Sequence, residues 1–111
     1  MTSIIKFLII FVKIYIILWQ LKDEFSEEEK KNIKQGIKQG LEGLKGQIDG
    51  LIDICVNIEA LSSSNADLML NSTFESEEAL KVYSQHQAHI KVANEKVRPF
   101  TKSRVCLDFE I

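Results

Sequence analysis

The chain has 111 residues, of which 45% are hydrophobic and 27% are charged, and its formal net charge at pH 7 is −2. This length fits one small domain with a single core, and the weak negative net charge gives no sign of the basic surface that nucleic-acid binding needs. The two cysteines, Cys55 and Cys106, lie too far apart in sequence for a zinc motif or a disulfide framework. We therefore expect a globular protein of a reducing compartment, the cytoplasm, without a nucleic-acid partner, a metal or another cofactor.

The most hydrophobic segment runs from Ile4 to Leu21 and has few polar residues, one of which is Lys13. Its length reaches the lower limit for a transmembrane helix, but a lysine near the middle is unusual in a membrane span. The high isoleucine content favours a buried strand instead. We expect a strand over residues 12–21 after an apolar extension over residues 1–11, and the alternative is a membrane anchor.

Apolar residues occupy both alternating faces of the predicted first strand, as in a strand that is covered on both sides. Ser26 and Glu29 then form the pattern of a capping box, which predicts the start of a helix. Apolar residues at helical spacing follow from Ile33 to Leu44.

All five glycines lie between Gly36 and Gly50. Within a helix each glycine costs about 0.5–1 kcal/mol relative to alanine, so these positions need a reason. We favour close packing of the helix against a neighbour. The alternative is that the missing side chains, at Gly40 for example, leave room for a ligand.

The second half of the chain predicts three strands and another helical region. Residues 52–58 alternate between apolar and polar side chains and predict a half-buried strand, and residues 67–74 predict its partner. The acidic residues before Ala79 favour a helix N-terminus there. Pro99 predicts a boundary of this helical region, and alternation from Arg104 to Ile111 predicts the last strand.

The resulting order is β-α-β-β-α-β, which indicates an α+β protein with a ferredoxin-like fold. In this topology the second and fourth strands lie at opposite edges of the sheet, which keeps Cys55 and Cys106 too far apart to bridge. Both helices cover the same face of the sheet, yet the first strand is apolar on both faces. A second copy of the sheet is the simplest cover for the open face, so we predict a homodimer.

Both histidines fall in one short stretch, from Val82 to Ile90, with Tyr83 before them. His86 and His89 are too few ligands for zinc, which needs three or four. A histidine can act as a general base near neutral pH, and a tyrosine hydroxyl can donate a hydrogen bond to a carbonyl oxygen or an enolate. Tyr83 and His89 are six positions apart, so only a bend near Gln87 would bring them together. The alternative is structural, with Tyr83 in the core, His86 as a cap and His89 as a hydrogen-bonding residue.

A set of short segments over residues 12–111 forms a distinctive combination. The segments are Leu21 to Glu24, Ser26 to Glu29, Ser72 to Ser76, the spaced Tyr83, His86 and His89, Val97 to Pro99, and the closing Asp108 and Phe109. In this combination the chain resembles the stress-responsive α/β-barrel (Dabb) family. The resemblance implies a ferredoxin-like protomer that pairs with a second copy to form a dimeric α/β barrel.

The resemblance implies less about activity, because most members of the family have no assigned activity. One plant branch closes polyketide rings by aldol condensation, with a tyrosine and a histidine spaced as Tyr83 and His89 are. Two positions differ from the family pattern: Ile14 stands where many members have a histidine, and Gln87 stands where a proline commonly occurs. We predict a pocket between the second helical region and the sheet, with Tyr83 and His89 as candidate catalytic groups. The other predicted pocket residues are His86, Ile14 and Gly40.

Three functions remain open on the sequence alone. The first is a stress-response protein, dimeric and without catalysis, that binds a small apolar or carbonyl-containing molecule. The second is a polyketide cyclase-like or other carbonyl-chemistry enzyme that uses Tyr83 and His89. The third is a membrane-tethered interaction module that uses residues 4–21.

Overall fold

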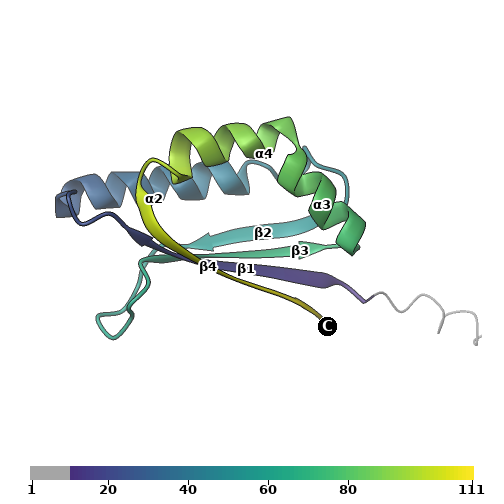
Figure 1. Cartoon of the computed structure of the whole chain (residues 1–111), viewed down its shortest axis with the longest axis horizontal. Helices are drawn as coiled ribbons and strands as arrows, with labels where there is room; N and C mark the ends of the chain where they lie inside the picture. The colour runs from purple at the N-terminus through teal and green to yellow at the C-terminus, as the bar shows by residue number, and fades with distance from the viewer. Residues whose placement is uncertain (1–10) are drawn as a thin grey trace, which may run out of the picture.

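The computed structural model describes residues 11–111, which follow the predicted order of strands and helices (Figure 1). The strands are β1 (Lys13–Leu21), β2 (Leu51–Asn57), β3 (Leu68–Phe74) and β4 (Thr101–Glu110). The helical segments are α2 (Glu27–Glu42), α3 (Glu77–Gln85), α4 (Gln87–Val92) and the π-helical turn η2 (Ala93–Val97). Within these residues no helix has the length and apolar composition of a membrane span. The predicted extension, residues 1–11, lies outside the described residues except for Phe11.

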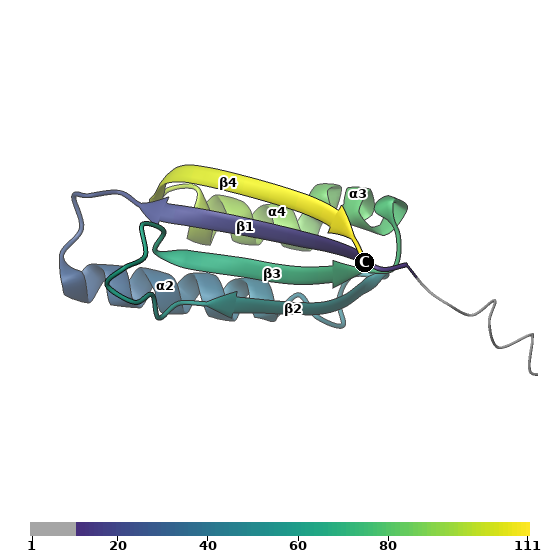
Figure 2. The same cartoon turned by 90° about the horizontal axis from the view of Figure 1, so that it is seen from below.

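The four strands form one antiparallel sheet in the order β2-β3-β1-β4 (Figure 2). Helices α2, α3 and α4 cover one face of this sheet, and the described part of the chain places no helix on the other face (Figure 1). This is the predicted ferredoxin-like fold. Cys55 and Cys106 lie on the two edge strands, and both are free thiols.

The core lies between the sheet and the helices. Ile17, Trp19 and Leu21 of β1 point to the helical side, where they pack with Leu41 of α2 and Phe74 of β3. These side chains are almost completely buried, and they fix β1 as the central strand under the helices.

Helix α2 begins at the predicted capping box. The N–H of Glu29 donates to Ser26 Oγ at 3.1 Å, and the N–H of Ser26 donates to Glu29 Oε1 at 2.8 Å. Farther along the helix, a Cβ atom at Gly40 would lie 2.9 Å from Cγ1 of Val92 in α4. Close helix packing therefore accounts for this glycine, as we favoured. Gly50 has a φ of +85° and leaves no room for a Cβ atom, which would lie 2.4 Å from Cβ of Ala79.

Strand β2 departs from the predicted alternation at its start. The sequence pattern placed Ile52 on the same face as Ile54 and Val56, but Ile52 is 43% exposed and Leu51 is buried. The register between β2 and β3 shifts between Leu51 and Asp53. Such an irregularity adds a residue to one strand and reverses the alternation on one side of it, so the prediction for Ile52 was wrong.

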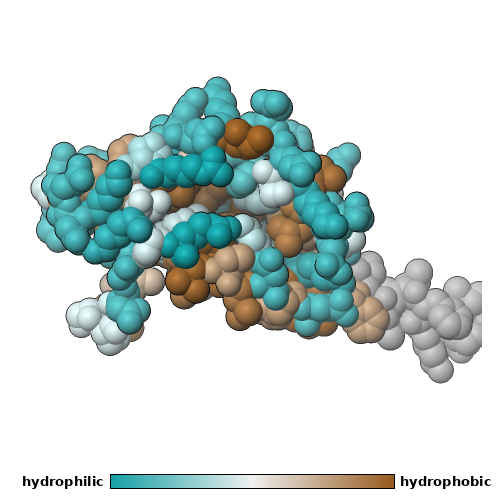
Figure 3. Space-filling model, viewed as in Figure 1, coloured by the Kyte–Doolittle hydropathy of each residue, from teal (hydrophilic) through white to brown (hydrophobic). Residues whose placement is uncertain are grey.

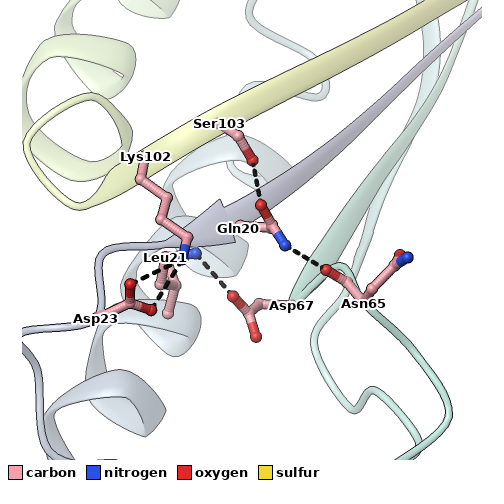
Figure 4. A network of polar contacts seen from close by, with 7 residues as sticks. All are labelled: Gln20, Leu21, Asp23, Asn65, Asp67, Lys102 and Ser103. Atoms are coloured by element: carbon pink, nitrogen blue, oxygen red, sulfur yellow. Dashed lines mark hydrogen bonds and ion pairs between the residues drawn. The ribbon is translucent and has the colours of Figure 1, made fainter.

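A polar network ties the end of β1 to its neighbours (Figure 4). The N–H of Leu21 donates to the Asp67 carboxylate at 2.7 Å. The Gln20 side chain donates to the carbonyl of Asn65 at 2.6 Å and accepts from the Ser103 hydroxyl at 2.9 Å. These bonds fix the first residues of β4, and with them the side chains that β4 contributes to the cavity described below.

The sheet face without helices is apolar. Leu18 of β1 is 38% exposed, and Val105 and Leu107 of β4 are each 62% exposed. Because Leu18 pairs with Val105 and Ile16 with Leu107, these side chains form one continuous patch. Hydrophobic surface accordingly gathers along the lower margin of the molecule in Figure 3.

Candidate functional site

A bend at His86 brings Tyr83 close to His89. Helix α3 ends at Gln85, and His86 has an extended backbone, with φ −70° and ψ 136°, before α4 begins. The Nδ1 atom of His86 accepts a hydrogen bond from the N–H of Ala88 at 3.0 Å, so His86 caps α4. The ring centroids of Tyr83 and His89 lie 4.3 Å apart as a result.

Tyr83 and His89 line a cavity of about 390 Å³ between the sheet and the segment α3-α4-η2. Ile17 and Trp19 of β1 and Leu41 of α2 form an apolar wall. This volume and an apolar lining with few polar groups are typical of small-molecule sites.

The phenol ring of Tyr83 is held on several sides. It packs edge-on against Phe74, with ring centroids 5.0 Å apart, and against Tyr15, with centroids 6.3 Å apart. Burial, and to a lesser extent the nearby Tyr15, raises the pKa of Tyr83 far above its ordinary value. The hydroxyl therefore stays protonated and can donate a hydrogen bond, but within residues 11–111 it has no hydrogen-bond partner.

The imidazole of His89 is half-buried, and burial lowers its pKa below the ordinary value of 6.5. The positive charges of Arg98 and Arg104 act in the same direction, whereas the backbone of Ser84 opposes them. His89 is therefore mostly neutral at about pH 7, the form that accepts a proton in general base catalysis. Its Nδ1 atom is buried and makes no hydrogen bond of good geometry among the described residues, so its interaction with the Ser84 backbone is a weak one.

Tyr15 and Arg104 are two polar residues of the cavity that the sequence did not reveal. Arg104 Nη2 donates to the Tyr15 hydroxyl at 2.6 Å, and both residues line the cavity. Burial raises the pKa of Tyr15, while Arg104 partly opposes this effect. The two residues meet only because β1 and β4 pair in the sheet, and no local sequence signal links them.

Three of the predicted pocket residues lie outside the lining of this cavity. Ile14 is opposite Phe109 in the sheet and alternates with Tyr15, so it belongs to the face without helices. At the start of β1 the residue that reaches the cavity is thus Tyr15, not Ile14. Gly40 packs against α4, and His86 serves as the cap between α3 and α4. No group of three or more His, Cys, Asp or Glu residues within residues 11–111 is arranged to hold a metal ion.

Comparisons with known proteins agree on a family and a fold. The family model described as the stress responsive A/B barrel domain matches residues 15–111. A dimeric ferredoxin-like protein of unknown function from Bacteroides fragilis is 25% identical, with a TM-score of 0.84 over 90% of this chain and 96% of that chain. A dimeric ferredoxin-like protein from Thermobifida fusca is 17% identical, with a TM-score of 0.73 over 91% and 92% of the two chains. A hydroxynitrile lyase from Passiflora edulis is 14% identical, with a TM-score of 0.68 over 90% and 93%. No curated protein matches the chain in sequence.

Proposed function

Because the chain belongs to the stress-responsive α/β-barrel family, we propose that it is a cytoplasmic stress-response protein that binds a small carbonyl-containing molecule beside Tyr83 and His89. The observation that carries this proposal is the buried Tyr83 hydroxyl, which has no hydrogen-bond partner among residues 11–111 and lies beside His89 in the cavity. An unpaired buried polar group costs about 1–3 kcal/mol. A carbonyl oxygen that accepts from the Tyr83 hydroxyl would remove part of that cost.

The cavity favours a mostly apolar ligand. Trp19, Ile17 and Leu41 offer apolar contact, and the polar groups are few and clustered near Tyr83. Because the Tyr83 hydroxyl and His89 Nδ1 are closed to water, lining side chains must move before a ligand can reach them.

A homodimer is part of the same proposal. The apolar patch of Leu18, Val105 and Leu107 needs a cover, and a second copy of the sheet offers a self-complementary one. Such an interface would bury at least about 1,200 Å² in total. The dimeric relatives from Bacteroides fragilis and Thermobifida fusca support this assembly. Light scattering at micromolar concentration should give twice the monomer mass, and a monomer mass would contradict the proposal.

A second candidate function is catalysis at the same cavity. The lowered pKa of His89 beside a protonated tyrosine favours this alternative. In it, His89 removes a proton from the carbon next to a carbonyl group, and the Tyr83 hydroxyl donates to the oxygen that becomes the enolate. The similar fold of a hydroxynitrile lyase is in keeping with an enzyme.

Benzylacetone, an apolar methyl ketone, tests both versions. Binding in the cavity should shift the NMR signals of Tyr83, Ser84 and His89, whereas Lys31, on the exposed face of α2, should not respond. If no cavity residue responds at millimolar concentration, the binding proposal fails for ketones.

Catalysis is followed with the same compound in deuterium oxide. A base at His89 should accelerate exchange of the hydrogens next to the carbonyl, and Tyr83→Phe or His89→Asn should slow this exchange by roughly 10² or more. Binding without accelerated exchange would leave the protein a binding module.

A further inference from the structure

Two guanidinium groups at the cavity have no carboxylate partner. Arg98, at the end of η2, and Arg104, in β4, both line the cavity, and both are exposed to solvent. Arg98 donates to the side-chain oxygen of Asn94, and Arg104 donates to the hydroxyl of Tyr15. Both of these partners are neutral, and neither arginine takes part in an ion pair within residues 11–111.

The charge around the cavity is therefore unbalanced. Neither aspartate nor glutamate occurs among the described residues that line it, so Arg98 and Arg104 contribute its only full charges when His89 is neutral. A neighbouring groove of about 500 Å³ shares Tyr15 and Arg104 with the cavity, but its charges are balanced. Its cations, Lys13, Lys81 and Arg104, are matched by Glu77, Asp108 and Glu110. The cavity has this excess of positive charge, whereas the groove beside it does not.

The positive charge also reaches the inner part of the site. Arg98 and Arg104 both disfavour protonation of His89, as two nearby cations must. An anion bound between the arginines would offset this repulsion, and guanidinium groups bind carboxylates through paired, charge-assisted hydrogen bonds.

We propose that the ligand is an oxo acid, in which a carboxylate binds to Arg98 and Arg104 at the rim while the carbonyl group lies toward Tyr83 and His89. The inference rests on the proposed function, because it names the class of ligand for the same cavity. The ligand takes this orientation because the polar groups of the cavity differ in exposure. The exposed arginines bind the hydrated carboxylate, and the buried Tyr83 hydroxyl donates to the carbonyl oxygen. The apolar part of the ligand then contacts the wall of Ile17 and Trp19.

Matched probes separate the carboxylate from the rest of the ligand. Benzylpyruvate has a ketone beside a carboxylate, and its methyl ester has the same skeleton without the charge. Calorimetric titration of the full chain at low salt should give an affinity for the acid at least about 10-fold above that for the ester. This preference should shrink when salt is added, because the arginines are exposed and their charges are screened.

Substitution of the arginines tests their role. Arg98→Gln and Arg104→Gln should each reduce the preference for the acid severalfold, while the affinity for the ester stays within about 2-fold, since hydrogen bonds to charged groups are the ones removed. Lys31→Gln is the matched control, because it removes one positive charge from α2 at a distance from the cavity. Circular dichroism of each variant establishes that the fold is intact, and Arg98→Gln, which spares the bond to Tyr15, serves as the second test if Arg104→Gln unfolds.

The outcomes distinguish this inference from the function on which it rests. Equal affinity of the wild-type protein for acid and ester would overturn the oxo acid assignment and leave ketone binding intact. An acid preference that survives both arginine substitutions would overturn it as well. If neither probe nor benzylacetone binds, the proposed function fails, and the oxo acid assignment fails with it.

Discussion

Replacement of Tyr83 by phenylalanine should stabilise the protein and weaken its ligand binding at the same time. The Tyr83 residue is 1% exposed, and its hydroxyl has no hydrogen-bond partner among residues 11–111. Folding therefore removes this hydroxyl from water without a replacement bond. The substitution keeps the ring and its contacts with Phe74 and His89 while it removes the unpaired group.

The size of the effect follows from the cost of the unpaired hydroxyl. That cost is about 1–3 kcal/mol, and the small void left by the missing oxygen offsets part of the gain. We expect a net gain of about 1 kcal/mol in the free energy of unfolding, which raises the melting temperature of a domain of this size by roughly 4 °C. The affinity for benzylacetone should fall by about 2- to 12-fold, the equivalent of one neutral hydrogen bond.

Tyr15→Phe is the matched control for this experiment. Tyr15 lines the same cavity, but its hydroxyl accepts a hydrogen bond from Arg104 at 2.6 Å. Because Tyr15→Phe removes a hydroxyl that has a hydrogen-bond partner, it should lower the melting temperature or leave it unchanged. Both variants are compared with the wild type by thermal unfolding at one protein concentration, because a dimer melts at a concentration-dependent temperature. A fall in the melting temperature of Tyr83→Phe relative to the wild type would refute the view that the Tyr83 hydroxyl is unpaired.

Three further predictions address the histidine, the sheet edge and the open sheet face. Because burial lowers the pKa of His89, its NMR titration should have a midpoint below 6.5. A midpoint above 6.5 would contradict the view that burial favours the neutral imidazole. Between that midpoint and about pH 6.5 the unfolded chain binds the proton more readily than the folded protein does. The free energy of unfolding should therefore decrease as the pH is lowered through this window, and His89→Phe should remove this dependence. At edge strand β2, Glu42 accepts from the N–H of Val56 at 2.9 Å and Lys38 donates to the carbonyl of Val56 at 2.8 Å. Glu42→Ala should lower the free energy of unfolding by about 1 kcal/mol in urea titrations and promote aggregation through the freed edge; unchanged stability and solubility would speak against this role. Leu107→Asp should give a monomer in light scattering, whereas Leu61→Asp, at an exposed loop position, should not.

Local signals in the sequence were sufficient for the elements and for the place where a bend could bring Tyr83 close to His89. Ser26 and Glu29 mark the start of α2 through contacts three residues apart. A bend near Gln87 was the condition for Tyr83 to approach His89, and His86 indeed ends one helix and caps the next. Each of these features depends on residues that are neighbours in sequence, so a single sequence contains the information.

Features that depend on strand register could not be predicted. The irregularity near Leu51 reverses which side chains of β2 are buried, and only the pairing with β3 reveals it. The assignment of Ile14 to the pocket failed for a related reason, because a shift of one residue moves a side chain to the opposite face of a strand. Tyr15 and Arg104 are 89 positions apart, and they meet through the pairing of β1 with β4.

Strand β4 contributes both to the proposed dimer interface and to the proposed ligand-binding cavity. Its alternate side chains serve opposite faces: Val105 and Leu107 lie on the open apolar face, and Arg104 lies in the cavity. Every residue of β4 is at least partly exposed, so within the described residues the strand depends largely on its pairing with β1. A partner sheet that covers Val105 and Leu107 would hold β4 in place, and with it the guanidinium group of Arg104. Loss of the dimer in Leu107→Asp should therefore also reduce the preference for benzylpyruvate over its ester, although position 107 does not line the cavity. An unchanged preference in a monomeric Leu107→Asp protein would separate assembly from ligand recognition.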